Sequence, residues 1–246
     1  MDIQIRFYEE LNDFLPPAQR KVTFRHHLKQ AASIKDTIEA LGVPHTEIDL
    51  ILVNGHSVGF DYPVQDGDRI SVYPVFEALD ITPVTRLRPA PLRVTRFVLD
   101  VHLGRLAAYL RLLGFDTLHR NDYDDPTLAE ISVNERRILL TRDRRLLMRK
   151  QITHGYYVRA TRPREQLLEV LIRFDLLKAQ RPFTRCLHCN GAIAAVSKAG
   201  ILPRLQPRTR IAYNEFWQCQ SCGKVYWKGM HYRRLCELIA AANTPR

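Results

Sequence analysis

Apolar and polar positions alternate along the first third of the chain in the way that half-buried β-strands require. A strand is predicted over residues 3–7, with 22–24 as its hairpin partner, and further strands over 49–53 and 69–73. Between them, residues 34–41 have the pattern of a short helix. These elements are delimited by the N-cap Ser33, the helix-ending Gly42 and the turn dipeptide Asn54-Gly55.

From residue 96 onward the pattern changes to alternating strands and helices. Residues 80–95 contain three prolines and no amphipathic period, which predicts a semi-extended linker. Beyond it, short apolar runs predict strands at 97–99, 115–118 and 137–141, and helices are expected over 103–113, after Pro126 and after Asp143. Alternation of this kind favours an α/β fold, a mostly parallel sheet covered by helices.

Charge is distributed unevenly along the chain, whose formal net charge is +11. Residues 1–80 carry −6, residues 81–95 carry +3, residues 96–180 carry +5 and residues 181–246 carry +9. Such a basic C-terminal half favours an anionic partner, and nucleic acid is the commonest. The acidic N-terminal part could dock on this basic surface and compete with RNA. No apolar run is long enough to span a bilayer and no signal peptide is visible, so we expect no membrane partner and a cytoplasmic location.

Several acids follow predicted strands directly. Asp100 ends the run at 97–99 and Asp143 follows Thr141, while Asp124 and Asp125 enter a helix. In open α/β sheets, functional groups collect at the carboxyl ends of strands, and carboxylates gathered there suit Mg²⁺ or Mn²⁺, as in metal-dependent nucleases. The alternative is structural, since an aspartate before a helix is commonly an N-cap.

Four of the five cysteines form two CxxC pairs, Cys186/Cys189 and Cys219/Cys222. Two such tight turns brought together supply four thiolates for a tetrahedral, structural Zn²⁺. The remaining Cys236 is expected to be a small buried apolar side chain. An odd number of cysteines also argues against a secreted disulfide framework.

Two parts of the chain resemble known families. The segment ILVNGHSV…DYPVQDGDRISVYP resembles the β-grasp fold of ubiquitin-like proteins, especially small sulfur carriers, although the C-terminal Gly-Gly that sulfur transfer needs is missing. The stretches RFVLDVHLGRLAAYLRLLGFDTL, DDPTLAEISVNERRILLTRDRRLL and FWQCQSCGKVYWKGMHY resemble the Mut-seven C-terminal RNase family, a branch of the PIN-type nucleases. The second resemblance implies an α/β/α sandwich with a C-terminal zinc ribbon and Mg²⁺- or Mn²⁺-dependent cleavage of RNA.

The resemblance also implies roles for individual residues. Asp100 and Asp143 would be metal ligands with Asp125 or Asp124 as the third, and Glu130 is a weak candidate for a fourth. The segments would be a β-grasp domain (1–79), a linker (80–95), a PIN-like nuclease domain (96–180) and a zinc ribbon (181–246). Basic side chains expected to contact RNA are Arg105, Arg111, Arg142, Arg144, Arg204, Arg208 and Arg210.

Two questions stay open at this stage. The aromatic residues Trp217, Tyr226, Trp227 and Tyr232 either stack RNA bases or pack a small core around the zinc ribbon. The function is predicted to be that of a metal-dependent ribonuclease. The alternatives are a non-catalytic RNA-binding protein and an adaptor that binds a protein partner through its ubiquitin-like domain.

Overall fold

The structure is a computed structural model, and it describes residues 1–74, residue 87 and residues 94–242. Nearly all of the predicted linker therefore lies outside the described residues. The chain forms two compact units, the first made of residues 1–94 and 124–157 and the second of residues 95–123 and 158–246. These units divide the predicted nuclease segment between them, and the three-domain division stays a prediction. Each unit is described by itself.

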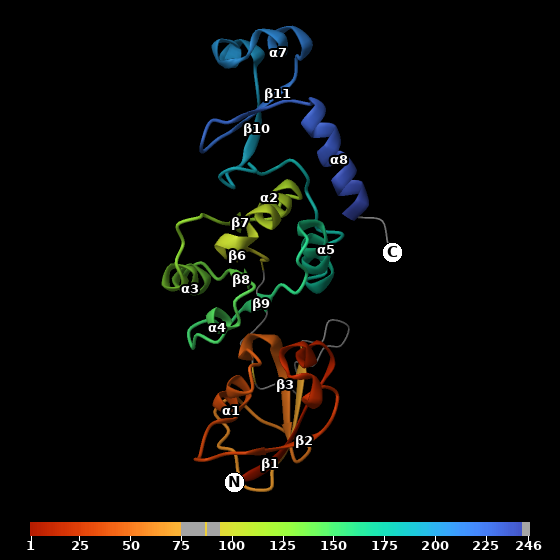
Figure 1. Ribbon diagram of the computed structural model, residues 1–246. Coiled ribbons are helices and arrows are strands. Elements are labelled where there is room, and N and C mark those ends of the chain that lie inside the picture. The colour runs from red at the N-terminus through yellow and green to blue at the C-terminus, as the bar shows by residue number, and fades with distance from the viewer. Residues whose placement is uncertain (75–86, 88–93, 243–246) are drawn as a thin grey trace. The chain divides into compact units, whose positions relative to one another are not determined.

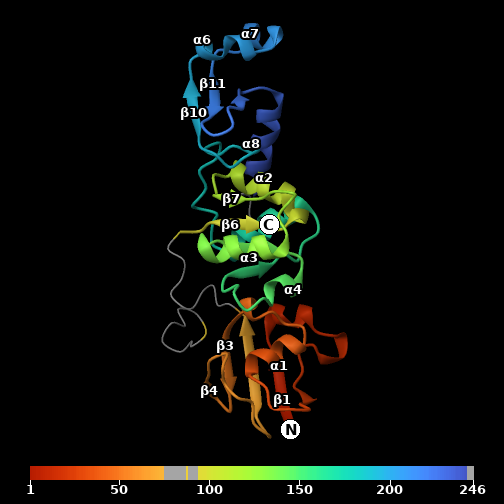
Figure 2. The same cartoon turned by 90° about the vertical axis from the view of Figure 1, so that its left-hand side faces the viewer.

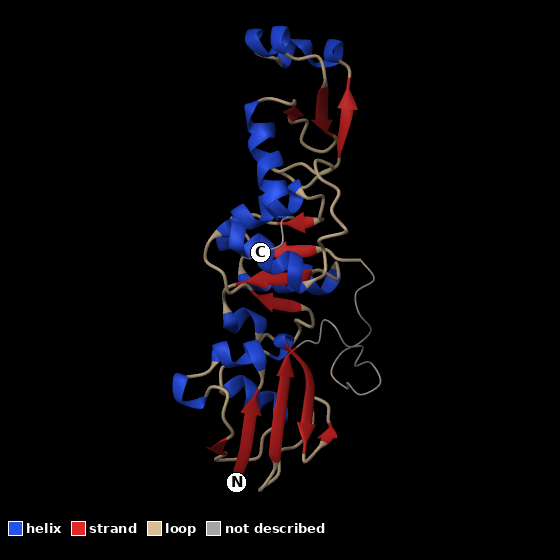
Figure 3. Cartoon of the chain, turned by 90° about the vertical axis from the view of Figure 1, so that its right-hand side faces the viewer, coloured by secondary structure: helices blue, strands red, loops and turns tan. Residues whose placement is uncertain are grey.

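The first unit contains a mixed sheet in its N-terminal part (Figures 1 and 3). Its strands are β1 (Asp2–Phe7), β2 (Phe24–His27), β3 (Ile48–Val53), β4 (His56–Ser57) and β5 (Arg69–Pro74). In the described residues the spatial order is β2-β1-β5-β3-β4, with β1 parallel to β5 and the other pairs antiparallel. Helix α1 (Ile34–Ala40) packs across one face of this sheet (Figure 2). This is the β-grasp arrangement predicted from the sequence.

Local chemistry explains where α1 begins and ends. The Ser33 hydroxyl accepts a hydrogen bond from the Asp36 N–H and donates one to the Asp36 carboxylate. Gly42 follows the helix with a φ of +92°, a conformation that strongly favours glycine. The apolar face of α1 contributes Ile34 and Ile38, both fully buried, to the core under the sheet. The predicted helix and its caps are confirmed.

The hairpin partner of β1 differs from the prediction. Val22 is 46% exposed, and of the predicted residues 22–24 only Phe24 belongs to β2. Lys21 has a φ of +58° and lies in a turn, so the chain resumes extended structure only at Phe24. The 3-10 helices η1 (Glu9–Phe14) and η2 (Pro17–Gln19) fill the connection between β1 and β2.

The rest of the first unit consists of α3 (Asp125–Asn134), β8 (Ile138–Thr141), α4 (Arg144–Leu147) and β9 (Gly155–Tyr157). Strands β8 and β9 are parallel, and β8 is buried along its whole length. Tyr157 at the end of β9 packs edge-on against Phe14, with 5.3 Å between ring centroids, and joins the β-grasp core.

Polar contacts also tie β9 and the loop before it to η3 (His45–Glu47). The buried Glu47 carboxylate accepts a hydrogen bond from the Tyr157 N–H at 2.7 Å. The His45 ring bonds the Ile152 carbonyl oxygen at 2.8 Å through Nε2 and the Glu39 carboxylate at 2.6 Å through Nδ1. The β-grasp part and the β8–α4–β9 segment are therefore packed as one body.

The second unit begins with β6 (Phe97–Leu99), η4 (Val101–Leu103), α2 (Gly104–Leu112), β7 (Thr117–Leu118) and α5 (Pro163–Arg173). Strands β6 and β7 are parallel, and α2 packs against α5. Gly114 ends the predicted helix with a φ of +92°, and a Cβ there would lie 2.3 Å from the Arg181 carbonyl oxygen. Only glycine satisfies both constraints.

The C-terminal part of this unit is an antiparallel sheet with short helices. Its elements are β10 (Ile193–Val196), α6 (Lys198–Ile201), η5 (Leu202–Arg204), α7 (Pro207–Ala212), β11 (Phe216–Cys219), β12 (Val225–Tyr226) and α8 (Met230–Ala242). The described order is β10-β11-β12 (Figure 3). Ile201, Leu205 and Phe216 form its small buried cluster. None of the described helices in the chain is long and apolar enough to cross a membrane.

Candidate functional site

The first predicted acid, Asp100, lies where β6 ends. It is 7% exposed and is the N-cap of η4, its Oδ1 accepting a hydrogen bond from the His102 N–H at 3.3 Å. Its position at the carboxyl end of a strand with a parallel partner is the one predicted.

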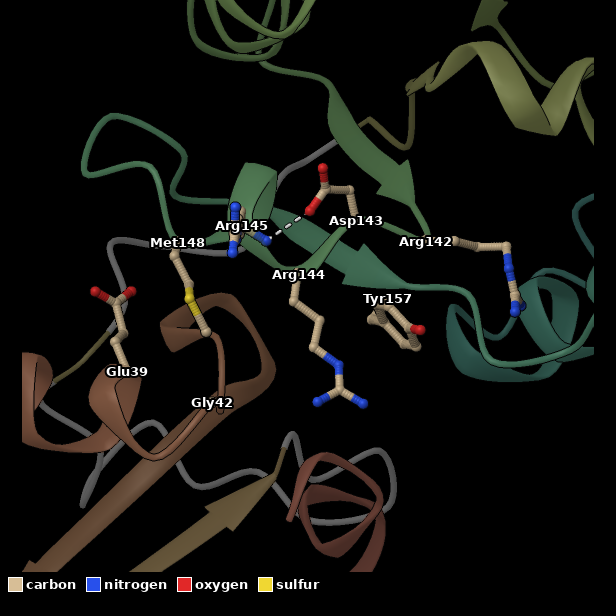
Figure 4. A pocket seen from close by; sticks show the side chains of 8 residues that line it. All are labelled: Glu39, Gly42, Arg142, Asp143, Arg144, Arg145, Met148 and Tyr157. Atoms are coloured by element: carbon tan, nitrogen blue, oxygen red, sulfur yellow. Dashed lines mark hydrogen bonds between the residues drawn. The ribbon is translucent and has the colours of Figure 1, made fainter. Parts of the chain in front are cut away.

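Asp143 occupies the equivalent place after β8 in the first unit. Its N–H donates to the Thr141 hydroxyl at 2.9 Å, and its Oδ1 accepts the Arg145 N–H at 2.8 Å, which makes it the N-cap of α4. The side chain lines a pocket of about 460 Å³ to which the β-grasp part contributes Glu39 and Gly42. In Figure 4 the Asp143 carboxylate and the Arg144 guanidinium point in opposite directions.

Asp124 and Asp125 begin α3. Asp124 is its N-cap, and the Thr127 N–H donates to Oδ1 at 2.9 Å. Hydrogen bonding by Thr127 holds the pKa of Asp124 below its usual value. Asp125 pairs with Arg149 at 3.6 Å, and both side chains are partly exposed. The first unit thus presents one capping acid and one ion-paired acid at the start of this helix.

The described side chains of the first unit do not bring Asp124, Asp125 and Asp143 together as a group of three ligand atoms. Asp100 belongs to the second unit. Asp100, Asp124 and Asp143 each cap the helix that follows them. Helix capping is the structural alternative that the sequence also predicted. The metal-binding role of these acids stays a prediction.

Two of the arginines expected to contact RNA serve the protein itself. Arg111 is 4% exposed and donates to the carbonyl oxygens of Thr117 (2.8 Å), His188 (2.9 Å), Leu187 (3.1 Å) and His119 (3.4 Å). Burial lowers its pKa. Arg144 donates to the Phe14 carbonyl oxygen at 3.1 Å and lies over the rings of Phe14 and Tyr157. The structure does not place Arg111 for the predicted phosphate contact, because the side chain is buried and four of its five N–H donors bond carbonyl oxygens. Arg144 is held against the β-grasp part.

Two of the other arginines bond backbone carbonyls. Arg204 donates to the Gly223 carbonyl oxygen at 2.6 Å, and Arg210 donates to that of Leu205 at 2.8 Å, so both brace the loop between β10 and β11. Arg105 and Arg208 are exposed, and Arg142 is half-buried beside the Asp143 pocket. For these three, phosphate contact stays a prediction.

The four predicted cysteines converge. Their sulfur atoms all lie within 4.8 Å of one another, with 3.7 Å between Cys186 and Cys222 and 3.4 Å between Cys189 and Cys219. Four sulfurs about 2.3 Å from a tetrahedral Zn²⁺ would be separated by about 3.8 Å, so the donor set fits this ion. None of the four takes part in a disulfide, and the cluster could bind zinc.

Neighbouring groups shape the cysteine cluster. The Tyr226 hydroxyl lies 3.0 Å from the Cys186 sulfur, and the N–H groups of Ser221 and Cys222 point at the Cys219 sulfur. Burial acts to raise the pKa of Cys186, but hydrogen bonds from Tyr226 and the backbone outweigh it and lower the pKa to about 6. The thiolate, the form that binds metal, is favoured at this position.

Sequence reasoning missed Asn190. Its side-chain carbonyl accepts the Thr117 N–H at 3.0 Å, while its amide donates to Asp116 at 2.8 Å. Asp116 also pairs with Arg185 at 3.4 Å. These bonds join the turn that carries Cys186 and Cys189, the first cysteine knuckle, to β7. No local pattern signals such a contact, because its partners are more than seventy residues apart in the chain.

Comparisons with known proteins agree with the resemblances noted in the sequence. Residues 1–80 match the model described as Mut7-C ubiquitin, and residues 95–239 match that of the Mut7-C RNAse domain. The crystal structure of SAMP1 from Haloferax volcanii matches 32% of this chain and 99% of its own, with 17% identity and a TM-score of 0.26, too low to bear on function. A search of curated proteins finds no match. The RNAse model spans more than half of the chain, and the protein therefore belongs to the Mut7-C RNAse domain family.

Proposed function

We propose that the protein is a metal-dependent ribonuclease that hydrolyses RNA phosphodiester bonds at an acidic Mg²⁺ or Mn²⁺ site. Asp100 and Asp143 would hold the ion, with Asp125 or Asp124 as third ligand. The observation that carries the proposal is the family match over residues 95–239, within which Asp100 and Asp143 each follow a strand that has a parallel partner. The carboxyl ends of parallel strands are the usual place for such groups.

The roles of the residues follow from their chemistry. A hard divalent cation bound there would activate water, orient the phosphate and neutralise the leaving oxygen. The carboxylates would supply oxygen ligands, and their helix-capping bonds would fix the direction of each side chain. Arg142, which lines the pocket of Asp143, is our candidate for holding the RNA backbone.

We also propose that the four cysteines hold a structural Zn²⁺. Four protein ligands close the coordination sphere, so this ion would support folding and leave no position for a substrate. The knuckle that carries Cys186 and Cys189 also supplies the carbonyls bound by Arg111, which connects the metal site to α2.

For the β-grasp part we propose an intramolecular role. Glu47, His45 and Phe14 all bond groups on the β8–α4–β9 segment, close to Asp143. These contacts favour a domain that braces the nuclease segment over an adaptor whose surface is free for a protein partner.

The test is cleavage of total RNA and of purified tRNA, with sequencing of the new ends. We expect cleavage with Mn²⁺ or Mg²⁺ and none after EDTA treatment. Because EDTA also removes zinc, activity should return with Mn²⁺ plus Zn²⁺ but not with Zn²⁺ alone. The Asp100→Asn/Asp143→Asn protein should bind RNA without cutting it, whereas Asp61→Asn, an exposed acid of the β-grasp part, should cleave normally. Equal cleavage by the double variant would leave a non-catalytic role for both acids.

A further inference from the structure

A cavity of about 700 Å³ lies in the second unit, between the cysteine-bearing sheet and the start of α8, and none of the four predicted acids is among its lining residues. Its volume is within the range of about 300–1,000 Å³ that ligand sites usually have. Figure 1 shows α8 running beside the antiparallel pair of strands β10 and β11. The aromatic side chains that line the cavity are Phe183, Trp217, Tyr226, Trp227 and Tyr232.

The aromatic residues are arranged in two groups. Phe183 and Tyr232 pack together, with ring centroids 4.7 Å apart, and Tyr226 is fixed by its hydroxyl bond to Cys186. Trp227, by contrast, is 39% exposed. The Trp227 ring lies beside Tyr213, with 6.4 Å between ring centroids, and part of the indole stays open to solvent at the cavity wall, where a ligand could reach it.

The charge of the cavity wall has one sign. Lysine, arginine and histidine side chains line it, and no carboxylate does. Lys224 and Arg234 are exposed, and the Lys228 ammonium lies 5.2 Å from the centre of the Trp217 ring. Glu215, which pairs with Lys228 at 2.8 Å, is outside the lining. An aromatic wall with a basic rim matches a ligand that has flat π-faces and negative charge.

We propose that this cavity binds single-stranded RNA, with a base stacked on Trp227 and neighbouring phosphates at Lys224 and Arg234. Stacking needs an unpaired base, so the site would select single-stranded segments over duplex without reading a particular sequence. The inference rests on the proposed function in one respect, since it names the form of RNA that the nuclease would engage.

The experiment uses the full-length, zinc-loaded Asp143→Asn protein with EDTA omitted and no Mg²⁺ or Mn²⁺ added, so that cleavage plays no part. The chain has two tryptophans, and both line the cavity, so their fluorescence reports its occupancy directly. The probes are an oligouridine of about ten nucleotides, chosen from the site sizes of single-strand binders, an abasic oligomer of equal length and a duplex. Affinities are measured in parallel by anisotropy of labelled probes.

We expect saturable quenching by the oligouridine and weak quenching by the other two probes. Trp227→Ala should weaken oligouridine binding by roughly 5- to 150-fold, and Trp227→Phe, which keeps a ring, should recover most of it. Ile211→Ala, which removes an 86% exposed apolar side chain on α7, is the matched control and should bind normally. Zinc content and circular dichroism of each variant show whether it is folded.

Three results would overturn the inference: equal binding of the abasic oligomer, unchanged affinity of folded Trp227→Ala, or self-association through this surface that Trp227→Ala abolishes while RNA affinity is kept. The outcome is separate from that for the proposed function. Stacking without metal-dependent cleavage by the native chain would retain this site and reject the nuclease, and cleavage with no effect of Trp227 would do the reverse.

Discussion

Replacing Arg111 should loosen the cysteine-rich part of the protein, with no specific effect on RNA binding. The guanidinium is buried and donates to four carbonyl oxygens, two of which belong to the residues between Cys186 and Cys189. Arg111→Met keeps a side chain of similar length without any donor. Arg111→Lys keeps the charge but not the planar fork that reaches several acceptors at once.

The size of the effect can be estimated from the surroundings of each acceptor. A hydrogen bond to a charged group contributes about 1.5–3 kcal/mol, and a buried acceptor left unpaired costs about 1–3 kcal/mol. The Thr117 carbonyl belongs to a fully buried residue, whereas water can reach the carbonyl of the exposed His188. We count the bond to the Thr117 carbonyl in full and the bonds to the Leu187 and His188 carbonyls in part. The free energy of unfolding should then fall by about 3–4 kcal/mol for Arg111→Met and by less for Arg111→Lys.

Urea unfolding gives the loss of stability, and the rate of zinc transfer to a chelator reports the knuckle itself. Arg111→Met should lower the unfolding midpoint and speed zinc release, with Arg111→Lys between it and the native chain. The matched control is Arg105→Met, on the exposed side of the same helix, which should change neither. Weaker RNA binding by Arg111→Met with unchanged stability and zinc release would refute the reasoning and restore the phosphate contact.

Two further predictions test the close contacts in each unit. Gly191→Ala should weaken zinc binding, measured by competition with a chromogenic chelator, because a Cβ there would lie 2.5 Å from the Ser221 hydroxyl and 2.9 Å from the Cys219 sulfur; native-like affinity would show that the knuckle relaxes freely. Glu47→Ala should speed hydrogen exchange of the Tyr157 amide roughly ten-fold or more, since that N–H loses a buried charged acceptor. Unchanged exchange would mean that the β-grasp part does not hold β9.

Features set by neighbouring residues were predictable from the sequence. The helix between Ser33 and Gly42 and the strand just before Asp100 follow from periodicity, caps and glycine conformation, and the structure has them at those places. The convergence of the two CxxC pairs was also predictable. Each pair forms a local turn that offers two thiolates, and a tetrahedral Zn²⁺ needs four. Strand β2 begins later in the chain than predicted, because the residues around Lys21 form a turn.

Features set by distant contacts were not predictable in this way. Arg105 and Arg111 lie on the same helix and look alike in sequence, yet one is exposed and the other is buried against carbonyls up to 77 residues away. The capping bonds of Asp100 and Asp143 were foreseen as an alternative, because they involve residues only two positions further on. Whether the same carboxylates share an ion depends on how distant strands meet, which local patterns do not encode.

Manganese binding followed by electron paramagnetic resonance tests the central claim most directly. The native zinc-loaded chain is titrated with Mn²⁺ beside the single variants Asp100→Asn and Asp143→Asn, and the free ion is counted. If the two carboxylates, 43 positions apart in the chain, ligate one ion, each single variant should remove the same site. If Mn²⁺ binding survives both substitutions while the stability of the helices they cap declines, these acids are caps alone, and the proposed hydrolytic centre does not exist.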